Sequence, residues 1–138
     1  MLFTGHCHCG NIRFEFETGF APEHLPLRAC QCSFCRAHGA VAATDPRGRV
    51  VITADDPAKL RRYRFGLGIT DFLICANCGV YLAAVSEIDG RWYASINANT
   101  LEVRGELRQE PRPVEYQGET AAERRTRRKQ GWTPAEFG

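Results

Sequence analysis

Long apolar runs are missing from this chain of 138 residues. No stretch approaches the ~18 apolar residues that a membrane-spanning helix needs, so no membrane partner is expected. The first residues lack the basic cluster and the apolar segment of a secretory signal peptide, which predicts a cytoplasmic protein. Internal repeats and low-complexity segments are also missing. With 43% hydrophobic and 25% charged residues, the composition is that of a globular domain.

A strong charge of one sign is missing as well. The chain carries 18 basic and 16 acidic side chains, a formal net charge of +2. Residues 1–115 are electrically balanced, and the basic excess lies in residues 116–138. A neutral body is a poor surface for duplex nucleic acid, so such a partner is not expected. We predict a zinc-binding domain over residues 1–115 and a charged C-terminal tail over 116–138, which buries little apolar surface.

The pattern of apolar residues predicts a mostly β protein. Residues 12–17 alternate apolar and charged side chains, as a half-buried strand does. Asp89-Gly90 is a tight hairpin signal between two further strands. A helical turn closed by Gly39 is expected at 33–38, and a short charged helix at 119–130. The other expected strands cover residues 27–30, 40–44, 50–54, 60–65, 70–74, 80–88 and 91–97.

Seven cysteines form three short clusters: Cys7 and Cys9, then Cys30, Cys32 and Cys35, then Cys75 and Cys78. An odd number cannot pair completely as disulfides, and disulfides are rare in a reducing compartment. Two thiolates on one tight turn can occupy two corners of a tetrahedron, which is the geometry that zinc prefers. The spacing therefore favours metal binding.

Glycines indicate which clusters share a metal. Gly10 follows Cys9 and Gly79 follows Cys78, and a glycine there permits a positive φ that turns backbone N–H groups toward the thiolates. Arg36 follows Cys35 instead. We therefore predict two zinc ions per chain. Four thiolates suit a structural zinc, and three thiolates with an open fourth position suit a catalytic one.

Other interpretations of the cysteines remain. Cys32-Ser-Phe-Cys35 and Cys75-Ala-Asn-Cys78 have the spacing of thioredoxin-like redox motifs, although no βαβ pattern surrounds them. A single zinc with three idle cysteines is a second possibility. His38, three residues after Cys35, is a candidate to close the central site.

Four segments resemble one known family, the glutathione-dependent formaldehyde-activating enzymes, also called the centromere protein V family. They are Gly5-His-Cys-His-Cys-Gly-Asn-Ile-Arg-Phe, Cys30-Gln-Cys-Ser-Phe-Cys-Arg, Cys75-Ala-Asn-Cys-Gly and Ile96-Asn-Ala-Asn-Thr-Leu, within residues 2–105. The resemblance implies an Mss4-like fold of small stacked antiparallel sheets held by zinc knuckles. It also implies a structural zinc on Cys7, Cys9, Cys75 and Cys78, and a catalytic zinc on Cys30, Cys32 and Cys35.

The same resemblance implies a carbon–sulfur lyase that joins or releases a small aldehyde and a thiol such as glutathione. A zinc with three thiolate ligands is a weak Lewis acid and suits a soft thiolate substrate. Glutathione has two carboxylates, for which Arg28, Arg36, Arg61, Arg62 and Arg64 are candidate partners. The alternative function is a zinc-stabilised, non-enzymatic binding module that uses the basic run 124–129 as its contact.

Overall fold

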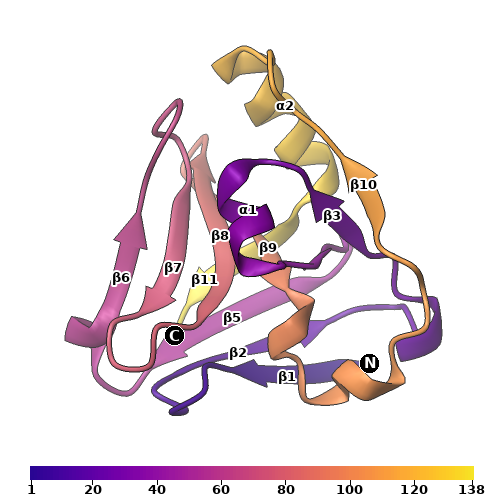
Figure 1. The fold of residues 1–138 in the computed structure, drawn as a ribbon, viewed down its shortest axis with the longest axis vertical. Helices are drawn as coiled ribbons and strands as arrows, with labels where there is room; N and C mark the ends of the chain where they lie inside the picture. The colour runs from indigo at the N-terminus through magenta and orange to yellow at the C-terminus, as the bar shows by residue number, and fades with distance from the viewer.

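A computed structural model describes residues 1–138 and confirms a mostly β protein with a short C-terminal helix (Figure 1). The helices are α1 (Ser33–His38) and α2 (Ala121–Gly131), and neither has the length and apolar character to cross a membrane. Four short 3-10 turns occupy the connections. The strands are β1 (Leu2–His6), β2 (Ile12–Glu17), β3 (Arg28–Cys30), β4 (Ala42–Ala43), β5 (Arg49–Ala54), β6 (Leu60–Tyr63), β7 (Asp71–Cys75), β8 (Tyr81–Ile88), β9 (Arg91–Asn97), β10 (Arg112–Val114) and β11 (Thr133–Phe137).

The strands form one mixed sheet rather than a set of wholly antiparallel ones. Its main path runs β1-β2-β5-β11-β9-β4-β3-β10, and β6, β7 and β8 branch from β9. Most neighbours are antiparallel, but β11 is parallel to β5 and β10 is parallel to β3. Because both parallel strands follow long connections, hairpin signals in the sequence could not reveal them.

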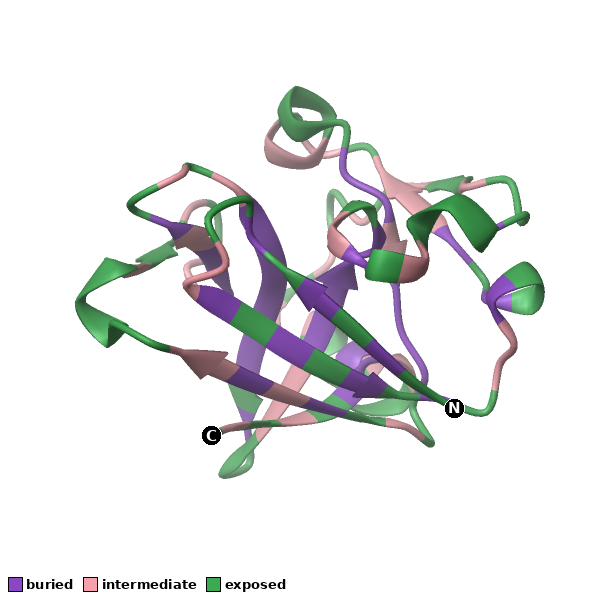
Figure 2. Ribbon diagram, turned by 90° about the horizontal axis from the view of Figure 1, so that it is seen from below, coloured by how far each residue is buried: buried purple, intermediate pink, exposed green.

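Alternating side chains build the core beside the first cysteine pair. In β1 and β2, every second residue is buried, as the bands in Figure 2 show. Phe3 and Phe16 meet edge to face at a centroid distance of 6.4 Å. Gly5 lies opposite Phe14, and a Cβ on Gly5 would come within 2.3 Å of the Phe14 ring. The ring therefore occupies the space that the missing side chain leaves.

The hairpin between β8 and β9 has the predicted turn. Asp89 and Gly90 both have positive φ, 53° and 79°. Two successive turn residues with positive φ give the hairpin a twist that matches the right-handed twist of its two strands. Asp89 tolerates the left-handed conformation better than most residues because its short side chain is polar. The turn fixes the register from Ile88↔Arg91 to Ala83↔Ile96.

The C-terminal segment is built into the sheet, and the expectation that it buries little apolar surface is wrong. The predicted helix is present as α2, with a capping box between Thr120 and Glu123. The strand after it, β11, was not predicted, and it lies between β5 and β9. Trp132 and Thr133 are both buried. The division at residue 115 stays a prediction, but residues 132–137 belong structurally to the body.

Candidate metal centres and the adjoining cavity

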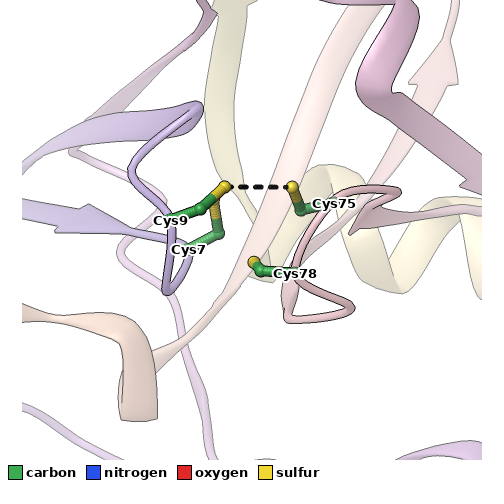
Figure 3. A group of neighbouring side chains, drawn as sticks. All are labelled: Cys7, Cys9, Cys75 and Cys78. Carbon is green, nitrogen blue, oxygen red and sulfur yellow. Dashed lines mark hydrogen bonds between the residues drawn. The ribbon is translucent and has the colours of Figure 1, made fainter.

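Four cysteine side chains converge where two turns meet. Cys7 and Cys9 lie on the turn after β1, Cys75 is the last residue of β7, and Cys78 lies on the turn that follows β7. Their four sulfur atoms are within 4.8 Å of one another and face inward (Figure 3). The Sγ–Sγ distance is 3.7 Å between Cys7 and Cys9, and 3.6 Å between Cys9 and Cys75.

The glycine argument for this cluster holds in the backbone. Gly10 and Gly79 have φ values of 83° and 82°, in the left-handed region that favours glycine. Each closes a tight turn, through hydrogen bonds from Gly10 N–H to Cys7 O and from Gly79 N–H to Cys75 O. The N–H of Ile12 donates to the Cys7 sulfur at 3.3 Å. The two turns are thus matched knuckles that present two sulfurs each.

This donor set fits a tetrahedral metal ion. Four sulfurs at the usual zinc–sulfur distance of ~2.3 Å are separated by ~3.8 Å, close to the spacings found here. Cys7 and Cys75 have no solvent exposure, whereas Cys9 is exposed and Cys78 is partly exposed. Burial raises the pKa of Cys7 to about 11. A thiol in that position ionises at neutral pH only beside a cation.

Three further cysteines form a second cluster. Cys30 ends β3, Cys32 caps α1, and Cys35 lies in the first turn of that helix. Their sulfur atoms are within 4.8 Å of one another, and all three residues are partly exposed. The N–H of Cys35 donates to the Cys32 sulfur at 3.4 Å. The short helix, closed by Gly39 as predicted, therefore orients the set.

Without a cation, the pKa values of Cys30 and Cys35 shift in opposite directions. A hydrogen bond with Cys35 lowers the pKa of Cys30 to about 5. The same contact, together with burial, raises the pKa of Cys35 well above its usual range. One thiolate therefore suppresses ionisation of its neighbour. A divalent cation would remove this conflict, so the donor set fits a metal ion bound by three thiolates.

His38 does not join this cluster. Its ring packs on Phe34 at a centroid distance of 4.5 Å and on Tyr81 at 5.6 Å. Phe34 also contacts Tyr63, Phe65 and Phe72. The predicted role of Phe34 in the core or site wall agrees with this aromatic cluster, and the sulfur group contains cysteines alone.

A cavity of about 720 Å³ opens beside the three-cysteine cluster. Cys30, Cys32 and Cys35 line one part of its wall, and Arg28 and Arg36 lie there as predicted. The other three predicted arginines do not line it. Arg62 and Arg64 instead bind the buried carboxylate of Asp71, and Arg61 lies exposed on β6.

The sequence interpretation missed three arginines on α2 that line the same cavity: Arg124, Arg127 and Arg128. In Figure 1, α2 lies above α1 and β3, and residues of all three elements line the cavity. The signal was present, because positions i, i+3 and i+4 share one helix face. Lys129, in the same basic run, points elsewhere and pairs with Asp89 at 2.8 Å. The surface required by the binding-module alternative is therefore largely turned inward.

Comparison with known proteins defines the class. The family model described as "Glutathione-dependent formaldehyde-activating enzyme" matches residues 2–116, so the chain belongs to this family. The family is Mss4-like, in agreement with the mostly β architecture and its two cysteine clusters. The helix α2 and the strand β11 lie beyond the matched residues.

Two individual proteins are similar. A Halomonas elongata protein named "Putative glutathione-dependent formaldehyde-activating enzyme" is 44% identical over 36 residues, which are 26% of this chain and 21% of that protein. The matched part is thus about a fifth of that relative's length. The crystal structure of a Rhodobacter sphaeroides protein superposes with a TM-score of 0.58 and 32% identity, covering 80% of this chain and 99% of that one.

Proposed function

We propose that this protein is a zinc-dependent carbon–sulfur lyase-type enzyme that joins or releases a small aldehyde and a thiol such as glutathione. The observation that carries the proposal is the placement of the three-cysteine cluster. It lines a cavity together with five arginines, whereas none of the four cysteines of the other cluster lines that cavity. Three thiolates also leave one corner of a metal ion's tetrahedron free beside this cavity, whereas four thiolates fill all the corners.

The two clusters take different parts in this proposal. Cys7, Cys9, Cys75 and Cys78 hold a structural zinc that joins two turns distant in sequence. Cys30, Cys32 and Cys35 hold the second ion. Zinc bound by these three thiolates would supply an exchangeable position at which a substrate thiol ionises at neutral pH.

The chain's own residues bind and enclose the substrates. The cavity volume of about 720 Å³ lies in the range of ~300–1,000 Å³ typical of small-molecule sites. Arg28 and Arg36 offer guanidinium groups to a carboxylate near the sulfurs. Phe72 and Tyr81 form an apolar wall that limits the access of water.

The reaction balances without an oxidant or reductant. The substrate's thiolate sulfur donates an electron pair to the carbonyl carbon of the aldehyde, and a carbon–sulfur bond forms. The π electrons of the carbonyl move to its oxygen, which takes a proton from water. In the opposite direction, the hydroxyl group loses its proton and the carbon–sulfur bond breaks. None of the seven cysteines forms a disulfide, which leaves all of them available as metal ligands and suits a cytoplasmic enzyme.

Ligand exchange in cobalt-substituted protein tests this function. Cobalt(II) in both sites gives visible bands that respond to a new sulfur ligand. We expect glutathione or a simple thiol at millimolar concentration to change these bands in a saturable way, and Arg36→Ala to weaken the effect of glutathione. The variant Cys35→Ala, retaining only the four-cysteine site, should show no such change. A spectrum of the two-metal protein that no thiol alters would contradict the proposal.

A further inference from the structure

Arg128 is a buried cation without a counter-ion. It is 6% exposed and lines the cavity, yet it forms no ion pair with any carboxylate. Its Nη1 donates to Thr70 Oγ1 at 2.5 Å and lies 3.4 Å from Ser86 Oγ. Its Nε has no hydrogen-bond partner at all. Buried polar groups are almost always hydrogen-bonded. The Arg128 guanidinium, by contrast, has an unpaired N–H and no carboxylate partner.

The neighbouring arginines add to the excess of positive charge around Arg128. Arg124 and Arg127 share the helix face, and both bind one carboxylate, Glu119, at 3.2 Å and 2.8 Å. These three guanidinium groups thus have one bound carboxylate among them, and the Cys30 thiolate attracts Arg127 and Arg128 only across the cavity. Burial, and then repulsion from Arg127 and Arg124, lowers the pKa of Arg128 to about 9. The site is therefore short of negative charge.

A purely structural role does not account for this charge. The guanidinium of Arg128 lies 4.3 Å from the ring centroid of Trp132, a contact that helps to hold α2 on the sheet. An apolar side chain could pack there without the desolvation cost of a buried cation. The acidic residue of the cavity lining, Glu115, is exposed and forms no ion pair. No carboxylate in the cavity lining therefore pairs with Arg128.

We propose that α2 carries a carboxylate-binding subsite, in which Arg128 together with Arg124 and Arg127 holds a carboxylate of the thiol substrate. The inference rests on the proposed function and narrows its substrate class to acidic thiols. Arg28 and Arg36 can take a second carboxylate near the cysteine cluster. The helix α2 lies beyond the residues that match the family model, so the family match does not by itself imply this subsite.

Fluorescence of Trp132 provides the direct test. The chain has two tryptophans, and in a Trp92→Phe background Trp132 is the only one left, in contact with Arg128. The probe is S-methylglutathione, which keeps both carboxylates but has no thiol for a metal. We expect a saturable change in Trp132 emission with the zinc-loaded protein. The affinity should fall as salt is added, because the contact is between charges.

Variants assign the binding to α2. Arg128→Met should weaken the probe by about tenfold or more, the size expected for losing a charge-assisted hydrogen bond. Arg128→Lys should restore part of the affinity. Glu119→Gln should strengthen binding, since it frees the charges of Arg124 and Arg127. Arg125→Gln is the matched control, because Arg125 is exposed on the same helix and does not line the cavity.

Two further experiments distinguish loss of the subsite from misfolding of the variant and from failure of the proposed function. If Arg128→Met fails to fold by circular dichroism, the double variant Arg124→Gln/Arg127→Gln, at less buried positions, provides the same test. An unchanged affinity in these variants, or no binding of the probe to the parent, overturns the subsite. Exchange of 2-mercaptoethanol in the cobalt protein reports on the proposed function independently, because this thiol has no carboxylate. Probe binding without thiol exchange would support the subsite and refute the lyase proposal.

Discussion

The sulfur atoms of Cys9 and Cys75 lie 3.6 Å apart, although the two residues are 66 positions apart in sequence. This contact joins the turn after β1 to the last residue of β7, and the two strands are not neighbours in the sheet. A metal ion at this point would therefore cross-link two parts of the fold that the backbone hydrogen bonds leave separate.

The two cysteine clusters should respond differently to mutation. Cys9→Ala or Cys78→Ala should unfold the protein, because a structural zinc contributes on the order of 10 kcal/mol of apparent folding energy. Cys35→Ala should leave a folded chain with about one zinc, since its cluster lies at a cavity wall. Metal analysis and circular dichroism on the three variants measure both quantities. Equal loss of structure in all three would remove the distinction between a structural and a catalytic site.

Removal of β11 should be strongly destabilising. A chain ending at residue 131 loses buried Trp132 and Thr133 and the pairing with β5 and β9. Loss of one buried aromatic side chain alone costs about 3–5 kcal/mol. Urea unfolding measures the change, and Glu136→Ala, which removes an exposed side chain from the same strand, is the control. A truncated chain with the midpoint of the parent would mean that β11 does not support the sheet.

Gly5→Ala should destabilise the protein by about 1–3 kcal/mol, as expected for overpacking. The added methyl group would meet the Phe14 ring at 2.3 Å, and the ring lies in the core. Gly105→Ala is the matched control, because nothing lies within 4 Å of a Cβ at that position and its φ is not positive. Thermal unfolding of the two variants should separate them. Similar midpoints would show that Phe14 moves aside without cost.

Glu119 should contribute stability only above acidic pH. Hydrogen bonds from Arg127, together with its charge and that of Arg124, hold the pKa of Glu119 below its usual 4.5. A lowered folded-state pKa means that the stabilisation is complete above the unfolded pKa and disappears as pH falls through the folded value. The difference in unfolding free energy between the parent and Glu119→Gln, about 1 kcal/mol, should be constant from pH 7 to pH 5.5 and shrink below pH 4.5.

The unfolding free energies of the parent and of Glu119→Gln are measured by urea unfolding across this pH range. The two proteins have the same cysteine ligands, so acid release of metal affects both and cancels in the difference. A difference that stays constant down to pH 3 would show that Glu119 is not ion-paired in the folded protein.

The strands next to local turn signals were predictable from the sequence. Asp89-Gly90 located the β8–β9 hairpin, and Gly39 located the end of α1, because each position needs a backbone conformation that few residues adopt. The β11 strand was not predictable in this way. Its sequence, Thr-Pro-Ala-Glu-Phe, has no clear alternation, and its place depends on a parallel pairing with β5, more than 80 positions away.

The candidate site was likewise predictable from the sequence only in part. Cysteine spacing and the glycines after Cys9 and Cys78 identified both clusters, because metal geometry imposes local rules on the chain. Arg61, Arg62 and Arg64 were candidates that do not line the cavity, because the sequence does not fix the direction in which a strand face points. Arg128 was missed because only the fold shows that its helix covers the cavity.

The position of β11 has a consequence for self-association. It is hydrogen-bonded to β5 on one side and to β9 on the other, so its detachment would expose two unpaired strand edges at once. The segment that fits this gap best is the β11 of another copy, delivered by its own α2. Exchange of this strand would leave every backbone hydrogen bond intact while tying two molecules together. A substitution that weakens the contact at Trp132 should therefore cause dimers to form as protein concentration rises. This should occur while the rest of the sheet is still folded.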